Sequence, residues 1–133
     1  MKKRNLLFIV LLFIIPNLIF SATRTVTDNG DSGEGTLRDA ISDASDDDEI
    51  VFELSTGNET ITLSSQLSID KSLKIDGSNT LGSGTTVTVK VTNPGTSTYR
   101  VFYISGSGKT VQISDMTIQG GYLAGGVGGC ILV

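Results

Sequence analysis

Residues 25–44 read TVTDNGDSGEGTLRDAISDA, a stretch that passes from an extended start through a Gly/Asp turn into a short helix signal. Leu37, Ala40, Ile41 and Ala44 recur at the i, i+3, i+4 and i+7 positions of a helix, so they form one apolar stripe on an otherwise polar segment. A helix of about two to three turns is not stable alone in water. We therefore expect this stripe to be buried, as a cap on the end of a column built from strands.

Polar residues define the start of the expected helix. Thr36 is placed to be the N-cap, because its hydroxyl can accept a hydrogen bond from a backbone N–H two or three residues further on. Arg38 lies between apolar cap residues, so its guanidinium either bonds carbonyl oxygens at the open end of the column or is an ordinary solvated charge. The predicted structural cap comprises Thr36, Leu37, Arg38, Ala40, Ile41 and Ala44.

The chain of 133 residues begins with a basic and then an apolar segment. Residues 2–4 are Lys-Lys-Arg and residues 6–20 are nearly all apolar, which is typical of a secretory signal peptide and short for a transmembrane span of about 20 residues. We predict a signal peptide over residues 1–21, cleaved before Ala22, and no transmembrane span in the mature chain. An uncleaved N-terminal anchor is the alternative.

The remainder of the chain is acidic. Three of the ten Lys and Arg residues lie in residues 2–4, which leaves seven basic against 14 acidic residues and a net charge of −7 after cleavage. Such a domain repels phosphate backbones, which argues against nucleic acid as a partner. Cys130 is the single cysteine, so no intramolecular disulfide can form, and we expect it to be a small residue packed in a strand.

Two acidic segments flank the expected helix. The turn at residues 28–39 loosely resembles a calcium loop, but Gly30 stands where an oxygen ligand is needed and Asp39 replaces the bidentate Glu. Residues 46–49 are four consecutive carboxylates, which favour a solvated loop over a metal site. Neither segment is predicted to bind a metal ion.

From residue 50 onward the apolar residues come in short alternating runs separated by Gly, Ser, Asn and Thr. Pairs of them recur at a step of 22 residues: Leu67 and Ile69, Val89 and Val91, Val111 and Ile113. A looser series contains Leu81, Tyr103 and Leu123. A coil of roughly 20 to 25 residues closed by Gly-rich corners is the period of a parallel β-solenoid. The predicted fold class is therefore all-β, a parallel β-helix with a short N-terminal capping helix.

An immunoglobulin-like sandwich is the alternative fold. It would need tight antiparallel hairpins, but the loop from the Asp-Gly pair at residues 76–77 to Thr86 is too long for one. The strand pattern still runs at residues 130–133 with no polar capping repeat after it, so we expect the column to be truncated at its C-terminal end and able to self-associate there. Residues 22–48 form the expected cap and residues 49–133 an incomplete β-helix.

The order of these elements resembles a known family. DSGEGTLRDAI, EIVFEL, ETITLSSQLSIDKSLKIDG and the Gly-rich run at residues 125–131 look like the N-terminal part of bacterial surface proteins of the polymorphic outer-membrane-protein type. Those proteins carry a CSLREA-type motif followed by a pectin-lyase-like right-handed parallel β-helix. Here Gly35 stands for the motif's Cys, Asp39 for its Glu, and Cys130 for a Gly of the Gly-rich element. The first difference removes any reason to expect a disulfide at the cap.

The resemblance implies a right-handed helix, export, and display at the cell surface, in particular the bacterial outer membrane. It implies a structural or adhesive role, with host or envelope glycans or proteins as partners. The same fold also carries enzymes, so the alternative function is the cap of a polysaccharide lyase or glycoside hydrolase whose active site lies beyond residue 133.

Catalysis on a β-helix needs carboxylates, often with a Lys or Arg base, on the same face of adjacent coils. At the 22-residue step no two carboxylates of the repeat meet, and the chain has no His. The triplets are Asp70 with Thr92 and Ser114, Lys71 with Asn93 and Asp115, and Asp76 with Thr98 and Gly120. We therefore predict no catalytic residue, metal or cofactor in this chain, and solvated exterior roles for Lys71, Lys74, Arg100 and Asp115.

Overall fold

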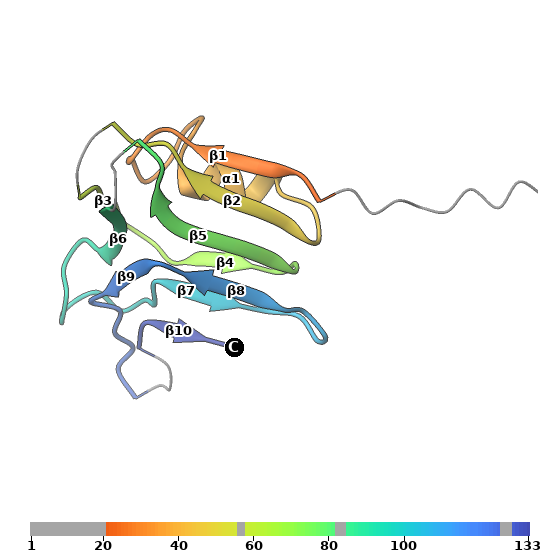
Figure 1. Ribbon diagram of the computed structural model, residues 1–133. Coiled ribbons are helices and arrows are strands. Elements are labelled where there is room, and N and C mark those ends of the chain that lie inside the picture. The colour runs from red at the N-terminus through yellow and green to blue at the C-terminus, as the bar shows by residue number, and fades with distance from the viewer. Residues whose placement is uncertain (1–20, 56–57, 82–84, 126–128) are drawn as a thin grey trace, which may run out of the picture.

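The computed structural model describes residues 21–55, 58–81, 85–125 and 129–133 (Figure 1). All of the predicted signal peptide except Ser21 lies outside these ranges. The described elements are β1 (Thr23–Val26), α1 (Leu37–Asp43), β2 (Asp48–Phe52), β3 (Thr60–Leu63), β4 (Leu67–Ile69), β5 (Leu73–Asn79), β6 (Thr85–Val91), β7 (Phe102–Ile104), β8 (Val111–Ser114), β9 (Met116–Gln119) and β10 (Ile131–Leu132).

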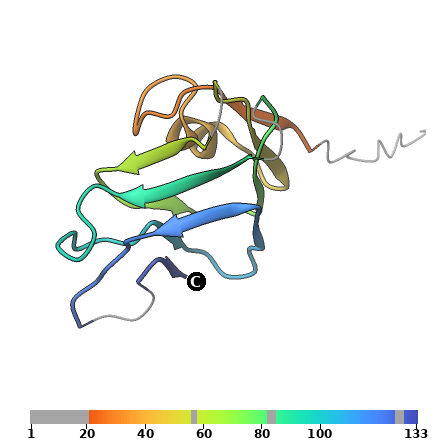
Figure 2. The same cartoon turned by 60° about the vertical axis from the view of Figure 1, so that its left-hand side comes forward.

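The strands stack in three parallel ladders. The first is β1-β2-β5-β8, the second β3-β6-β9 and the third β4-β7-β10. Figure 1 shows the first ladder face-on, and Figure 2 shows β3, β6 and β9 side by side and pointing the same way. The chain is thus a parallel β-solenoid of about four turns, with one short helix near its start. The predicted fold class is confirmed, and the sandwich alternative is wrong.

The predicted 22-residue register is wrong. Leu67 pairs with Phe102, and Val89 pairs with Ile61, so the two residues lie in different ladders and do not stack on each other. The looser series is wrong as well, since Leu81 is 56% exposed at a corner and stacks in no ladder.

The turns of the solenoid differ in length because their corners do. Asp48 pairs with Leu73, 25 positions later, whereas Leu73 pairs with Val111, 38 positions later. A solenoid tolerates such insertions, since only the strands have to align from turn to turn. Along each strand every second residue points inward. A step of 22 is an even number, so it relates one inward residue to another inward residue although the two lie in different ladders.

The interior of the column is apolar on all three sides. The alternation within β5 and β6 follows inward and outward positions, as expected for strands with one buried face. The inward side chains of the second and third turns are almost completely buried: Ile50, Phe52, Ile61, Leu63, Leu67, Ile69, Leu73, Ile75, Val87, Val89, Val91 and Phe102. Their burial is the main driving force for this fold.

Neighbouring turns approach closely at one point in the first ladder. The Asp-Gly pair at residues 76–77, expected between strands, lies inside β5, which then makes a two-pair antiparallel bridge to β6. A Cβ atom added to Gly77 would collide with the Asp115 carbonyl oxygen and lie 2.7 Å from Cβ of Met116. Only glycine fits where these two turns meet.

Candidate functional site

The predicted cap residues gather at the N-terminal end of the column. The hydroxyl of Thr36 accepts a hydrogen bond from the backbone N–H of Asp39 at 3.3 Å and donates one to the Gly33 carbonyl at 2.8 Å. The N–H of Ala44 donates to the Ala40 carbonyl and closes the last turn. Thr36 is therefore the N-cap, as predicted, and Ala44 is the C-cap.

The apolar stripe of α1 is buried. Leu37 is completely buried, Ile41 is 4% exposed, and Ala40 and Ala44 are below 10%. All four belong to the same hydrophobic core as the inward residues of β1 and β2. The helix thus covers the first turn of the solenoid, which protects strand edges that would otherwise be open at that end.

Arg38 connects the cap to the corner between β3 and β4. Its Nη1 donates to the Gln66 carbonyl at 2.9 Å, and its Nη2 donates to the Ser65 carbonyl at 3.0 Å. Its Nε donates to the Asp31 carbonyl at 3.0 Å, while Nη2 also contacts the Asp31 carboxylate at 2.6 Å. Of the two alternatives drawn for Arg38, these contacts match the one in which it bonds carbonyl oxygens.

Asp31 completes this connection from the loop before α1. Its carboxylate accepts hydrogen bonds from Arg38 and from both the hydroxyl and the backbone N–H of Ser64. Burial opposes ionisation of Asp31, but the hydrogen bonds from Arg38 and Ser64 outweigh it, so the pKa of Asp31 lies below its ordinary value. The ionised carboxylate is thus favoured by folding.

Lys71 binds the other end of the helix. Its ammonium donates to the carbonyl oxygens of Ile41, Ser42 and Ala44 at 3.1, 3.1 and 2.8 Å. These are the carbonyls that a helix leaves unpaired at its C-terminus, where a cation also suits the helix dipole. The prediction that Lys71 is a solvated exterior residue is therefore wrong.

The acidic run at residues 46–49 is a solvated loop only in its first half: Asp46 and Asp47 are exposed in a turn, as predicted, whereas Asp48 and Glu49 belong to β2. Asp48 is 1% exposed and begins β2, so the predicted boundary after residue 48 falls inside this strand. Its carboxylate accepts from the backbone N–H groups of Ser45 at 2.9 Å and Ala22 at 2.8 Å, and lies 3.4 Å from Nε of Arg24. The hydrogen bonds from Ser45 and Ala22, followed by Arg24, lower the pKa of Asp48 against the effect of its burial. Asp48 lies two positions before Ile50 and four before Phe52, so it shares their inward side of the strand. This alternation was the sequence signal from which its burial could have been predicted.

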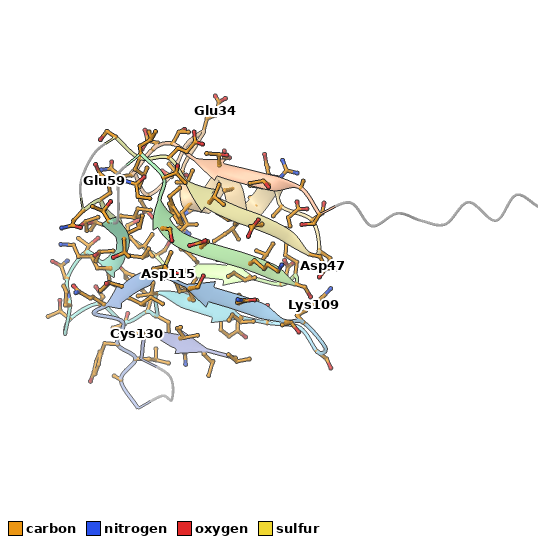
Figure 3. All side chains as sticks on the ribbon, in the orientation of Figure 1. Glu34, Asp47, Glu59, Lys109, Asp115 and Cys130 are labelled. Atoms are coloured by element: carbon orange, nitrogen blue, oxygen red, sulfur yellow. The ribbon has the colours of Figure 1, made fainter. Side chains whose placement is uncertain are left out.

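Asp46 stabilises a corner shared by three turns. Its carboxylate accepts from the backbone N–H of Ser72 at 2.8 Å and pairs with the ammonium of Lys109 at 2.8 Å. The hydrogen bond from Lys109, followed by that from Ser72, lowers the pKa of Asp46. Figure 3 shows Lys109 at the same corner as Asp47, which has a positive φ of 69°. The carboxylates of Asp46 and Asp48 therefore link neighbouring turns through hydrogen bonds and ion pairs.

Two residues weighed for metal binding, Asp28 and Asp39, have structural partners. Oδ1 of Asp28 accepts from the N–H of Gly30, and Oδ2 of Asp39 from that of Gly35. Within residues 21–55, 58–81, 85–125 and 129–133 no three His, Cys, Asp or Glu residues gather as a possible metal site. Because the register is not 22 residues, the predicted triplets do not form: Asp76 pairs with Ser114 and lies beside no carboxylate in that ladder.

Cys130 lies beside the last turn of the column, at the opposite end from Glu34 of the cap loop (Figure 3). It directly precedes β10 and is half-buried, so the prediction that it is packed within a strand is wrong by one residue. Its carbonyl oxygen accepts from the N–H groups of Val101 and Phe102 at 3.0 Å.

Among the solvent-open grooves of the described residues are two with contrasting polar linings. A groove of about 550 Å³ lies between β1 and α1 and includes Arg24, Glu34, Asp39 and Asp43. A second, of about 350 Å³, follows the ends of β3 and β6 and is lined by uncharged polar groups: Ser64, Thr92, Asn93, Thr96, Ser97, Thr98 and Tyr99. Sequence reasoning missed the second groove, although its Ser/Thr-rich composition at residues 92–98 was visible.

A row of hydroxyl groups also crosses the second ladder, separated from the second groove by the next outward row, Thr62, Lys90 and Gln119. Thr60 pairs with Thr88 and Thr88 with Thr117, so three threonines stand in line across β3, β6 and β9. Adjacent strands are about 4.8 Å apart. The outer side of the second ladder thus carries a row of three hydroxyl groups, then a row that contains Lys90, and then the groove with the aromatic ring of Tyr99.

Together these features define a parallel β-solenoid with a helical N-terminal cap and polar surfaces on its outer side. Comparison of the chain with family models, with curated proteins and with solved structures finds no match. Among the described residues no helix has the length and apolar character needed to cross a membrane.

Proposed function

We propose that this chain is an exported, surface-displayed β-solenoid with a structural or adhesive role, which binds glycans or proteins through its outer faces. The observation that carries the proposal is the polar outer surface of the second ladder, whose aligned outward residues are Thr60, Thr62, Thr88, Lys90, Thr117 and Gln119. It combines the row Thr60, Thr88 and Thr117 with the groove that contains Asn93 and Tyr99. Hydroxyl and amide groups next to an aromatic ring suit a neutral sugar, which needs many hydrogen bonds and one apolar face.

Three carboxylates of this chain have structural partners. Asp31, Asp46 and Asp48 accept hydrogen bonds within the fold that lower their pKa values, so they are engaged in stabilising the fold. The resemblance to surface proteins of the polymorphic outer-membrane-protein type points to the structural or adhesive role, and the basic and apolar residues 1–21 supply the export signal that this role requires.

Glycan binding tests the proposal directly. The chain is screened against immobilised neutral and acidic oligosaccharides, alongside the variants Asn93→Ala and Thr98→Val, which remove polar groups from the groove. Ser107→Ala, at an exposed position outside the groove, is the matched control. We expect both groove variants to weaken binding about tenfold, as the loss of one good hydrogen bond does, and the control to bind normally. Turnover of a pectin-like polymer by the chain would instead favour the polysaccharide lyase or hydrolase alternative.

A further inference from the structure

The backbone nitrogen of Ala22 is held against a buried carboxylate. It donates a 2.8 Å hydrogen bond to Oδ1 of Asp48, whose side chain is almost fully buried at the start of β2. The carbonyl of the same residue accepts from the N–H of Glu49 at 2.9 Å. Ala22 is thus fixed on both sides immediately before β1.

Ala22 is also the residue that becomes the N-terminus if the predicted signal peptide is removed. Hydrolysis of the bond between Ser21 and Ala22 consumes one water, leaves a carboxylate on Ser21 and frees the amine of Ala22, which takes up a proton at neutral pH. We propose that this cleavage places the new α-ammonium of Ala22 on Asp48, and that the resulting ion pair locks β1 and the N-terminal cap onto the solenoid. The proposal rests on the export included in the proposed function.

Energetics favour the cleaved form. In the uncleaved chain Asp48 accepts two neutral backbone hydrogen bonds, and its nearest cation, Arg24, lies 3.4 Å away with its side chain 39% exposed. The burial of the carboxylate is therefore compensated mainly by neutral donors. An α-ammonium at the position of the Ala22 amide adds a full positive charge and a stronger, charge-assisted hydrogen bond.

Cleavage also removes one hydrogen bond of the uncleaved chain. The hydroxyl of Ser21 donates to the Asp47 carbonyl at 2.7 Å, at an exposed position. Exposed hydrogen bonds of this kind contribute little, because water replaces them. The net effect of cleavage at this site is a more stable cap.

The charges on neighbouring elements set the background for this ion pair. Among the described residues Arg24 of β1 is the cation that contacts Asp48, and Lys71 is engaged with the end of α1. The charged groups on the elements around Ala22 are Arg24, Asp43, Asp46, Asp47, Glu49, Lys71, Lys74 and Lys109. Four of these eight are acidic and four are basic, so the preference for a cation at Ala22 comes from Asp48 itself.

Five proteins test the ion pair. Three are the chain from residue 22 with a free amine, the same chain with an acetylated N-terminus, and the chain from residue 21. The other two are the Asp48→Asn variant of the chain from residue 22, with a free and with an acetylated N-terminus. All contain every described strand and α1. Acetylation restores an amide N–H at Ala22 and so mimics the uncleaved chain, while the chain from Ser21 carries its ammonium one residue too early.

At pH 7 we expect the free-amine chain from Ala22 to melt about 5 °C or more above both the acetylated chain and the chain from Ser21. With Asp48→Asn, acetylation should no longer change the melting temperature. A paired cation titrates above its ordinary range, so the advantage is present below about pH 8 and is lost as the pH rises further. Equal melting of the free and acetylated chains at pH 7, or an equal acetylation effect with Asp48→Asn, would overturn the ion pair.

Export is tested separately by mapping the N-terminus of the chain released from a secreting cell. An N-terminus at Ala22 supports the processing step. A chain that keeps residues 1–21, or that starts elsewhere, overturns that step whatever the melting experiments show. A failure of export and a failure of the ion pair are therefore distinguishable.

Discussion

Nη2 of Arg38 lies 2.6 Å from Oδ1 of Asp31, and the two side chains together tie the helix to the corner between β3 and β4. Arg38 supplies donors to two corner carbonyls, and Asp31 accepts from Ser64 at the same corner. The cap is therefore attached by a polar network as well as by its apolar stripe.

Replacing Arg38 with Met should destabilise the chain. The Asp31 carboxylate and two corner carbonyls lose their donor, and the Arg38 side chain is only 30% exposed, so we expect a loss of about 1–3 kcal/mol in the free energy of unfolding. Urea denaturation measures this. Lys90→Met is the matched control, because Lys90 pairs in its ladder with Thr62 and Gln119, which are uncharged. Equal stability of the Arg38→Met and Lys90→Met variants would show that the network does not attach the cap.

Acidification should remove part of the same stabilisation. The pKa of Asp31 is lowered in the folded chain, so its contribution is present above the unfolded value near pH 4 and is lost as the pH falls through the lower folded value. The variant Asp31→Asn should be less stable than the natural chain at pH 7 and lose less stability between pH 5 and pH 2. Denaturant titrations across this range give the two slopes. Parallel curves would contradict a role for the ionised form, since Asp48 and Asp46 titrate in both proteins.

The close approach of two turns makes Gly77 sensitive to substitution. A Cβ at this position would meet backbone of residue 115, which cannot move aside without breaking the ladder, so we expect Gly77→Ala to cost about 2 kcal/mol or more. Gly95→Ala is the control. Gly95 has a φ of 85° but open space around it, so its cost should be only about 1 kcal/mol. Thermal melting of both variants compares crowding with backbone strain, and equal losses would argue against the crowding.

The last described turn should promote self-association. Its inward residues Val111, Ile113 and Ile118 are only partly buried, whereas Leu73 and Ile75 one turn earlier are at most 2% exposed. Strand edges beside exposed apolar side chains favour pairing between molecules. Sedimentation of the chain from residue 22 should show association that rises with protein concentration.

The variant Ile113→Lys should reduce that association about tenfold or more, because it introduces a charge into the contact. Leu81→Lys is the control. It adds the same charge at an exposed apolar residue outside the last turn, so it should leave the association unchanged. A chain that remains monomeric at all concentrations, or an equal effect of the two substitutions, would contradict an interface at this end.

The sequence by itself determined the class of fold and the nature of the cap. Alternation in the strands and the i, i+3, i+4, i+7 spacing of Leu37, Ala40, Ile41 and Ala44 are local patterns, and each reports directly which side chains are buried. The hydroxyl of Thr36 caps a helix through contacts within a few residues, so it too could be predicted. Arg38 was identified as a cap residue for the same reason, although its acceptors were not.

Only the tertiary structure decided the register and the polar partners. Corner loops of different length shift the pairing of Leu73 to Val111 without changing the alternation, so no fixed step could reveal it. Lys71 reaches the end of α1 across 27 to 30 positions of sequence, and Ala22 reaches Asp48 across 26. Such contacts depend on which turns are stacked, and the stacking is set by the burial of the whole column rather than by any one segment.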